Sequence, residues 1–112
     1  MNPQIKQKWV SALRSGEYKQ TQRHLHDEYG FCCLGVLCDL YIKENNLEWE
    51  PSRYDDNVYV FQDGVADLPL SVVEWSGIPN HNLLDINART FANLNDNAYT
   101  FEQIADVIEE QL

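Results

Sequence analysis

An apolar run from Phe31 to Ile42 is the longest in the chain, and it limits what the rest of the sequence can fold into. Only Gly35 and Asp39 interrupt it. Apolar residues fall on every side of a helical wheel, so a helix here has no polar stripe to face water and needs cover from other elements. About a dozen residues are too few to cross a bilayer and too many for a typical strand. The run therefore predicts a buried central helix.

Gly35 stands inside this predicted helix, where glycine is about 1 kcal/mol less favourable than alanine. Its lack of a side chain is useful if another backbone segment or an aromatic ring packs directly against the helix. We therefore expect a close approach at Gly35.

Helical patterns lie on both sides of the central run. Asn2-Pro3 predicts the start of a first helix and Ser15-Gly16 its end. Near the C-terminus, residues 95–98 predict a turn, after which Thr100 and Gln103 have the spacing of a capping box. The two expected inward stripes are Ile5, Trp9, Ala12 and Leu13 in the first helix, and Phe101, Ile104, Ala105, Ile108 and Leu112 in the last.

Two shorter helices are expected between these. Leu68-Pro69 opens one that contains Val72, Val73 and Trp75 and closes at Gly77, after which Pro79 restarts the chain. Residues 86–94 predict the other, with inward positions at Ile86, Phe91 and Leu94.

The remaining segments predict a small antiparallel sheet. Residues 18–26 alternate weakly, which is typical of a short strand or hairpin, and residues 27–30 turn into the central helix. Asn45-Asn46 ends that helix, and two strands are expected at 47–50 and 58–61, with a turn at 62–64 and a return at 65–66. Helices with a small sheet make an α+β fold, and 112 residues make a single compact domain, 1–112.

The charge of the chain is unevenly distributed. The net charge is −10, which opposes direct binding to nucleic acid or to an anionic membrane over the whole surface. Five of the eight Lys and Arg residues nevertheless lie in the first 30 positions, together with only three of the 18 Asp and Glu residues. The first twenty residues are polar, so neither a signal peptide nor a membrane span is expected, and a cytoplasmic location is favoured.

Several segments together carry a family resemblance that spans nearly the whole chain. They are Ser15–Gln20, Phe31–Leu40, Leu68-Pro69 with Trp75 and Gly77, Leu94–Asp96, and Thr100-Phe101 with Ile104-Ala105. The most specific is Cys-Cys-Leu-Gly-Val-Leu-Cys-Asp-Leu at 32–40. The chain thereby resembles a family of small proteins associated with bacteriophage and prophage genomes. The resemblance implies a setting, the cytoplasm of a bacterial host, where small phage accessory proteins act by binding host components, including parts of antiviral defence.

Hydrogen-bond donors are concentrated just before the central helix. If that helix begins near residues 29–32, its N-terminal N–H groups and positive dipole end follow these donors directly. Arginine binds phosphate oxygens, and Tyr18 or Tyr29 could stack on a base. We therefore predict a non-catalytic site for a small anionic, nucleotide-type host signal, with no cofactor and no metal. The residues of this site are Arg14, Tyr18, Lys19, Gln20, Arg23, His24 and His26.

A simpler interpretation of the same residues stays open. They could form a solvated hairpin whose cations offset the acidic remainder of the chain.

The three cysteines, Cys32, Cys33 and Cys38, lie in or beside the predicted central helix. Their apolar surroundings favour reduced, packed thiols of a cytosolic protein. The alternative is a small cysteine hydrolase, because a cysteine at a helix N-terminus has a lowered pKa, with His24, His26 or His81 as its base.

Metal binding has weaker support. His24 and His26 with Cys32-Cys33 provide four zinc ligands, but neither pair has the spacing of a structural zinc site. Residues 93–98 resemble a calcium loop only superficially, because Ala98 and Ile104 stand where the glycine and the bidentate glutamate belong.

Acidic residues support a second class of function. A nucleic-acid mimic that inhibits a host protein would display carboxylates at phosphate-like spacing, whereas ordinary solubility explains the same composition. Tryptophans 9, 49 and 75, if exposed, would indicate a homo-oligomer interface. The acidic candidates are Asp55, Asp56, Asp63, Asp67, Asp106, Glu109 and Glu110.

Overall fold

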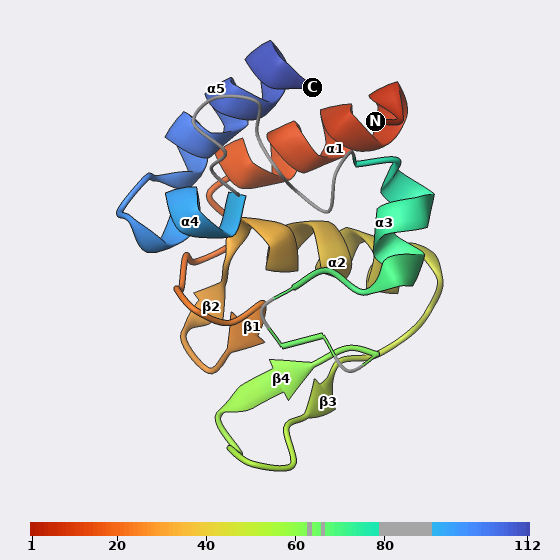
Figure 1. Cartoon of the computed structure of the whole chain (residues 1–112), viewed down its shortest axis with the longest axis vertical. Coiled ribbons are helices and arrows are strands. Elements are labelled where there is room, and N and C mark those ends of the chain that lie inside the picture. The colour runs from red at the N-terminus through yellow and green to blue at the C-terminus, as the bar shows by residue number, and fades with distance from the viewer. Residues whose placement is uncertain (63, 66, 79–90) are drawn as a thin grey trace.

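The computed structural model describes residues 1–62, 64–65, 67–78 and 91–112. Helices surround one central helix, and a small sheet lies on the side away from the two termini (Figure 1). This arrangement confirms the α+β fold. The helices are α1 (Pro3–Arg14), α2 (Cys33–Glu44), α3 (Leu70–Ser76), α4 (Phe91–Asp96) and α5 (Phe101–Gln111). The strands are β1 (His26–Asp27), β2 (Gly30–Phe31), β3 (Glu50–Pro51) and β4 (Val58–Val60).

The predicted central helix is confirmed as α2, which begins two residues later than the apolar run and ends before Asn45, as predicted. Every residue from Cys33 to Asp39 is buried, as is Ile42. Phe31 belongs to β2 instead, and Cys32 is the N-cap residue, whose Sγ accepts from the N–H of Gly35. Helices α1, α3 and α4 all contact α2, which explains why its sequence has no polar stripe.

The expected close approach at Gly35 is also present. A Cβ added there would lie 1.7 Å from the carbonyl oxygen of Leu25, so the backbone of residue 25 rests directly on the helix. That carbonyl accepts from the N–H of Cys32, and the Leu25 side chain is fully buried. This contact positions the segment that precedes β1.

The first and last helices follow the sequence prediction closely. Asn2 Oδ1 accepts from the N–H groups of Gln4 and Ile5, and Gly16 has the left-handed φ of 77° expected after a helix end. The capping box of Thr100 and Gln103 is present in α5. Helices α1 and α5 pack side by side (Figure 1), because their apolar stripes face a common core. Within those stripes, Ala12 and Leu112 are only half-buried.

The short helices agree in part with expectation. α3 ends at Gly77, with φ 68°, as predicted. In α4, Phe91 and Leu94 are buried as expected, but the predicted turn begins too early, because α4 continues to Asp96 and the turn lies at 97–98. Pro79, His81 and Ile86 lie outside the described residues.

The sheet differs most from the sequence prediction. Its strand order is β2-β1-β4-β3 with antiparallel pairing, and the β1–β2 hairpin turns at 28–29 as expected. The predicted strand at 18–26 is wrong except for an isolated bridge from Gln20 to Phe31 and for its last residue, His26. Polar groups of Gln20, Thr21 and Arg23 bond to α4. In the strand predicted at 47–50, only Glu50 pairs with a neighbouring strand, β4. Val65, predicted as part of a returning strand, is not in a strand, and residues 63 and 66 lie outside the described part.

Within the described ranges, no helix combines the length and apolar character needed to cross a membrane.

The Gly35 contact generates a stability prediction. Gly35→Ala should lower the free energy of unfolding by about 3 kcal/mol, the upper end for overpacking, because the new methyl group meets a backbone carbonyl that cannot rotate away. Urea denaturation followed by circular dichroism measures this. An increase in stability, as alanine normally produces inside a helix, would show that no such contact exists.

Candidate functional site

The segment from Lys19 to His24, here called the 19–24 loop, contains the centre of the predicted site. It runs beside β2, where the N–H of Thr21 donates to Phe31 O and the N–H of Phe31 donates to Lys19 O, each at 2.8 Å. Gln20, Thr21, Gln22 and Arg23 line an open depression of about 650 Å³. The loop therefore forms a polar surface of defined shape.

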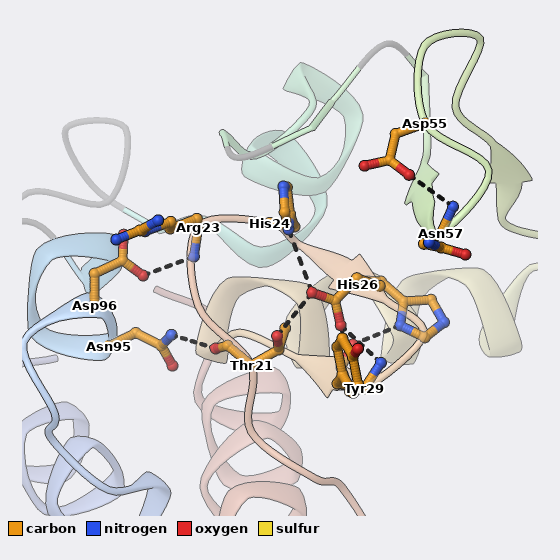
Figure 2. A network of polar contacts seen from close by, with 11 residues as sticks. Thr21, Arg23, His24, His26, Tyr29, Asp55, Asn57, Asn95 and Asp96 are labelled. Carbon is orange, nitrogen blue, oxygen red and sulfur yellow. Dashed lines mark hydrogen bonds and ion pairs between the residues drawn. The ribbon is translucent and has the colours of Figure 1, made fainter.

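Hydrogen bonds to the side chain of Asn95, which is fully buried, anchor this loop. Its Oδ1 accepts from Gln20 Nε2 at 2.9 Å and from the N–H of Cys33 at 3.1 Å. Its Nδ2 donates to Thr21 O at 2.7 Å (Figure 2). Gln20 Nε2 also donates to Tyr99 O at 2.7 Å. One amide group thus connects the loop to both α4 and α2.

The N-terminus of α2 is consequently not a phosphate site. The N–H of Cys33 donates to Asn95, and the N–H of Gly35 donates to Cys32 Sγ at 3.4 Å, all within the buried interior. The expectation that an anion meets these N–H groups is therefore wrong. The side chain of Asn95, 62 positions after Cys33 in the sequence, accepts the hydrogen bond proposed for the ligand.

Arg23 marks the most unusual backbone conformation of the loop. Its φ is 72°, the left-handed region that few non-glycine residues adopt. Its N–H donates to Asp96 Oδ1 at 2.9 Å (Figure 2). Such a conformation persists when surrounding contacts enforce it, and Asp96 provides one of those contacts. The side chains of Lys19, Gln22 and Arg23 are exposed.

Asp27 closes the far end of the loop and is 7% exposed. Its Oδ2 accepts from Thr21 Oγ1 at 2.8 Å and lies 3.3 Å from His24 Nδ1. Its Oδ1 accepts from the N–H groups of Tyr29 and Gly30. Burial raises the pKa of Asp27, but these hydrogen bonds outweigh burial and hold the pKa below its ordinary value of 3.8. The carboxylate therefore stays ionised and holds Thr21 and the His24 ring of the loop in place.

Three of the predicted site residues have structural roles instead. Arg14 pairs with Asp106 at 2.6 Å and with Glu109 at 2.8 Å, and these ion pairs join α1 to α5. Glu109 and Asp106 raise the pKa of Arg14 further above its ordinary range. The helical periodicity of α1, not closeness along the chain to the loop, decides where Arg14 points.

Tyr18 and His26 are likewise engaged elsewhere. The hydroxyl of Tyr18 donates to Asp39 Oδ2 at 2.6 Å, and burial together with this bond raises the pKa of Tyr18 to about 12. The ring of His26 stacks between Phe31 and Tyr59, with centroid distances of 3.8 and 4.6 Å. Its Nδ1 lies 2.7 Å from Gly30 O. We therefore assign Arg14, Tyr18 and His26 to the fold, and retain Lys19, Gln20, Arg23 and His24 at the site.

The cysteines are free and buried, as the apolar surroundings predicted. Burial raises the pKa of Cys32 to about 11, and raises the pKa values of Cys33 and Cys38 well above their usual range. Nucleophilic catalysis needs the thiolate, so these thiols give the hydrolase alternative no support. His81 lies outside the described residues.

Metal-ligating side chains are also dispersed in the part of the chain that the structure describes. No three His, Cys, Asp or Glu side chains there converge in a way that could hold a metal ion.

Four residues that the sequence did not single out organise the site: Thr21, Asp27, Asn95 and Asp96. No local pattern distinguishes a buried, bridging asparagine from one in an exposed turn, and the sequence predicts a turn at 95–98.

The acidic candidates are spread over several segments, and some of them are already paired. Asp106 and Glu109 bind Arg14, and Asp55 Oδ1 accepts from the N–H of Asn57. Asp56 and Asp67 are exposed outside helices and strands, Glu110 is exposed on α5, and Asp63 lies outside the described residues.

The Asn95 network leads to a second prediction. Asn95→Leu should lower the free energy of unfolding by about 3 kcal/mol, because it removes the partner of the buried Cys33 N–H and of Thr21 O and one of the two acceptors of Gln20 Nε2. Chemical denaturation measures this loss, and amide exchange should accelerate at residues 20–24. Asn97→Ala, which removes an exposed hydrogen bond, is the control and should cost about 0.5 kcal/mol. Equal losses in both variants would contradict the role of Asn95.

Asp27 generates a third prediction, on pH. Because its pKa is lower in the folded protein than in the unfolded chain, its carboxylate contributes stability above the ordinary pKa of 3.8. That contribution is lost as the pH falls through the lower, folded-state pKa. Urea unfolding between about pH 5 and pH 2 should therefore show a smaller acid-induced loss in Asp27→Asn than in the wild type. Asp56→Asn is the control; a wild-type slope in both variants would contradict the prediction.

The comparisons with known proteins bear on the chain as a whole. The model of a family described as "Domain of unknown function (DUF8296)" matches residues 1–112. A search of the curated proteins found no match, and a search of the solved structures found none either. Because the family model covers the full length of this sequence, the chain belongs to the DUF8296 family.

Proposed function

We propose that this protein is a non-enzymatic phage accessory protein that binds a small anionic, nucleotide-type signal of its bacterial host at the 19–24 loop. Sequestering such a signal in the host cytoplasm would act against antiviral defence. The observation that carries the proposal is a cationic loop on a rigid support: Lys19 and Arg23 are exposed, while Asn95 and Asp96 hold the backbone beneath them.

The support of the loop favours binding because it lowers the entropy lost when a ligand docks. Gln20 and Thr21 are tied to Asn95, and Thr21 is tied in addition to Asp27. Gly30 packs so closely that an added Cβ would lie 2.1 Å from Lys19 O. The backbone that carries the cations is therefore in place before a ligand arrives.

The charge of the loop favours an anionic ligand. Lys19 and Arg23 form no ion pair with any carboxylate of the described residues, whereas Arg14 forms two. Unpaired ammonium and guanidinium groups bind phosphate oxygens through charge-assisted hydrogen bonds. Gln22, also exposed, adds amide donors and an acceptor that suit a base or a ribose.

The depression over the loop has a suitable size. Its volume of about 650 Å³ lies within the range of small-molecule sites, roughly 300–1,000 Å³. A nucleotide can therefore place its phosphates near the two cations while its base or sugar occupies the rest of the surface.

Calorimetric titration with ATP, ADP, a cyclic dinucleotide and adenosine tests the proposal. At least one phosphorylated compound should bind and raise the melting temperature, and adenosine should not. Lys19→Ala and Arg23→Gln should each weaken that binding about tenfold or more, because each removes a charged hydrogen bond worth about 1.5–3 kcal/mol. The melting temperature of the unliganded variants should stay that of the wild type.

Lys8→Gln is the matched control, since Lys8 is an exposed cation of α1 outside the loop. It should leave the affinity unchanged. The proposal fails if none of the phosphorylated compounds binds, or if Lys8→Gln weakens binding as much as Arg23→Gln does.

A further inference from the structure

A second concave surface lies at the opposite edge of the sheet from the 19–24 loop. The loop adjoins β2, whereas this groove adjoins β3, at the other end of the strand order β2-β1-β4-β3. We call it the Trp49 groove, and its volume is about 550 Å³. Its lining residues are Asn46, Leu47, Glu48, Trp49, Glu50, Phe61 and Gln62.

The floor of the Trp49 groove is aromatic and fixed in place. Trp49 Nε1 donates to Asp39 Oδ1 at 3.1 Å, and Asp39 is only 6% exposed. The same carboxylate accepts from Tyr18 and pairs with Lys43 at 3.1 Å, so its own position is firmly held. The rings of Trp49 and Phe61 meet edge to face with centroids 6.3 Å apart. The indole ring is thus half-exposed in a single orientation.

The rim of the groove combines apolar and acidic groups. Leu47 is 42% exposed and lines the groove together with Trp49 and Phe61. Glu48 and Glu50 are exposed on either side of Trp49. Neither glutamate forms an ion pair with a base of the described residues.

We propose that the Trp49 groove binds a basic segment of a partner protein by accepting an arginine side chain. The methylene groups of the arginine lie along Leu47 and Phe61, its guanidinium plane covers the indole of Trp49, and Glu48 or Glu50 accepts its N–H groups. This surface shares no residue with the 19–24 loop, so it does not depend on the proposed ligand of that loop.

Charge complementarity favours a basic peptide segment as the ligand of the Trp49 groove. Residues 31–112 carry three Lys and Arg residues against 15 Asp and Glu residues, so the body of the protein attracts a basic partner before contact. The volume of about 550 Å³ admits a peptide segment, whereas a single side chain or small amine would leave most of the groove empty.

Two capped peptides serve as probes: Leu-Arg-Leu-Arg-Leu, and the same peptide with glutamine in place of each arginine. Titration into ¹⁵N-labelled protein at low salt should shift the backbone signals of residues 46–50 and 61–62 and the indole signal of Trp49. The glutamine peptide should bind at least tenfold more weakly.

Glu48→Gln combined with Glu50→Gln should weaken binding of the arginine peptide at least tenfold. The control combines Glu74→Gln with Glu110→Gln, which removes the same charge from exposed positions on α3 and α5, and it should change the affinity less than twofold. Equal weakening in the two double variants would show only general attraction to an acidic surface and would overturn the proposal.

Other outcomes would also overturn the proposal. The first is an arginine peptide that produces no shifts at millimolar concentration, or shifts only away from the groove. The second is arginine amide binding as tightly as the peptide, which would make the groove a small-cation site. The third is broadening of the groove signals with protein concentration in the absence of peptide, which would make the groove an interface between two copies of this chain.

Discussion

The buried side chain of Asn95 is the interaction on which the loop, α4 and the start of α2 all depend. A carboxylate could accept the same hydrogen bonds from Gln20 and Cys33, but it could not donate to Thr21 O. A charged group would also be costly at a position with no solvent exposure. An amide is neutral and has both a donor and an acceptor. It can therefore accept from the N–H of Cys33 at the start of α2 and also hold the loop, and none of these groups is left unsatisfied.

A second constraint acts together with the first. The backbone of Leu25 lies on Gly35, and the Leu25 side chain enters the core, so the chain must pass over α2 just after the loop. Residues 20–24 are thus held between two anchors, Asn95 at one end and Leu25 at the other. A short segment fixed at both ends displays its polar side chains outward. The buried contacts of Asn95 and Leu25 therefore support the exposed surface that carries Lys19 and Arg23.

Short-range and long-range contacts explain which predictions from the sequence were correct. α1 and α5 were predicted well because capping residues and an apolar stripe are local signals within each helix. The strands contain only two or three residues each, too few to show a reliable alternation. The candidate site was grouped by closeness along the chain, and this grouping kept Lys19 with Arg23 but wrongly included Arg14, which points to α5.

The sequence by itself determined that one apolar helix lies at the centre, that Gly35 admits a close neighbour, and that the thiols are buried. Each follows from residue type and periodicity within about a dozen positions. Only the tertiary structure decided which polar groups remain available to a ligand. Hydrogen bonds such as that from Cys33 to Asn95 join groups far apart in the chain, and the packing of α4 against α2 brings them together. Whether a donor is free or already paired is therefore a property of the folded chain.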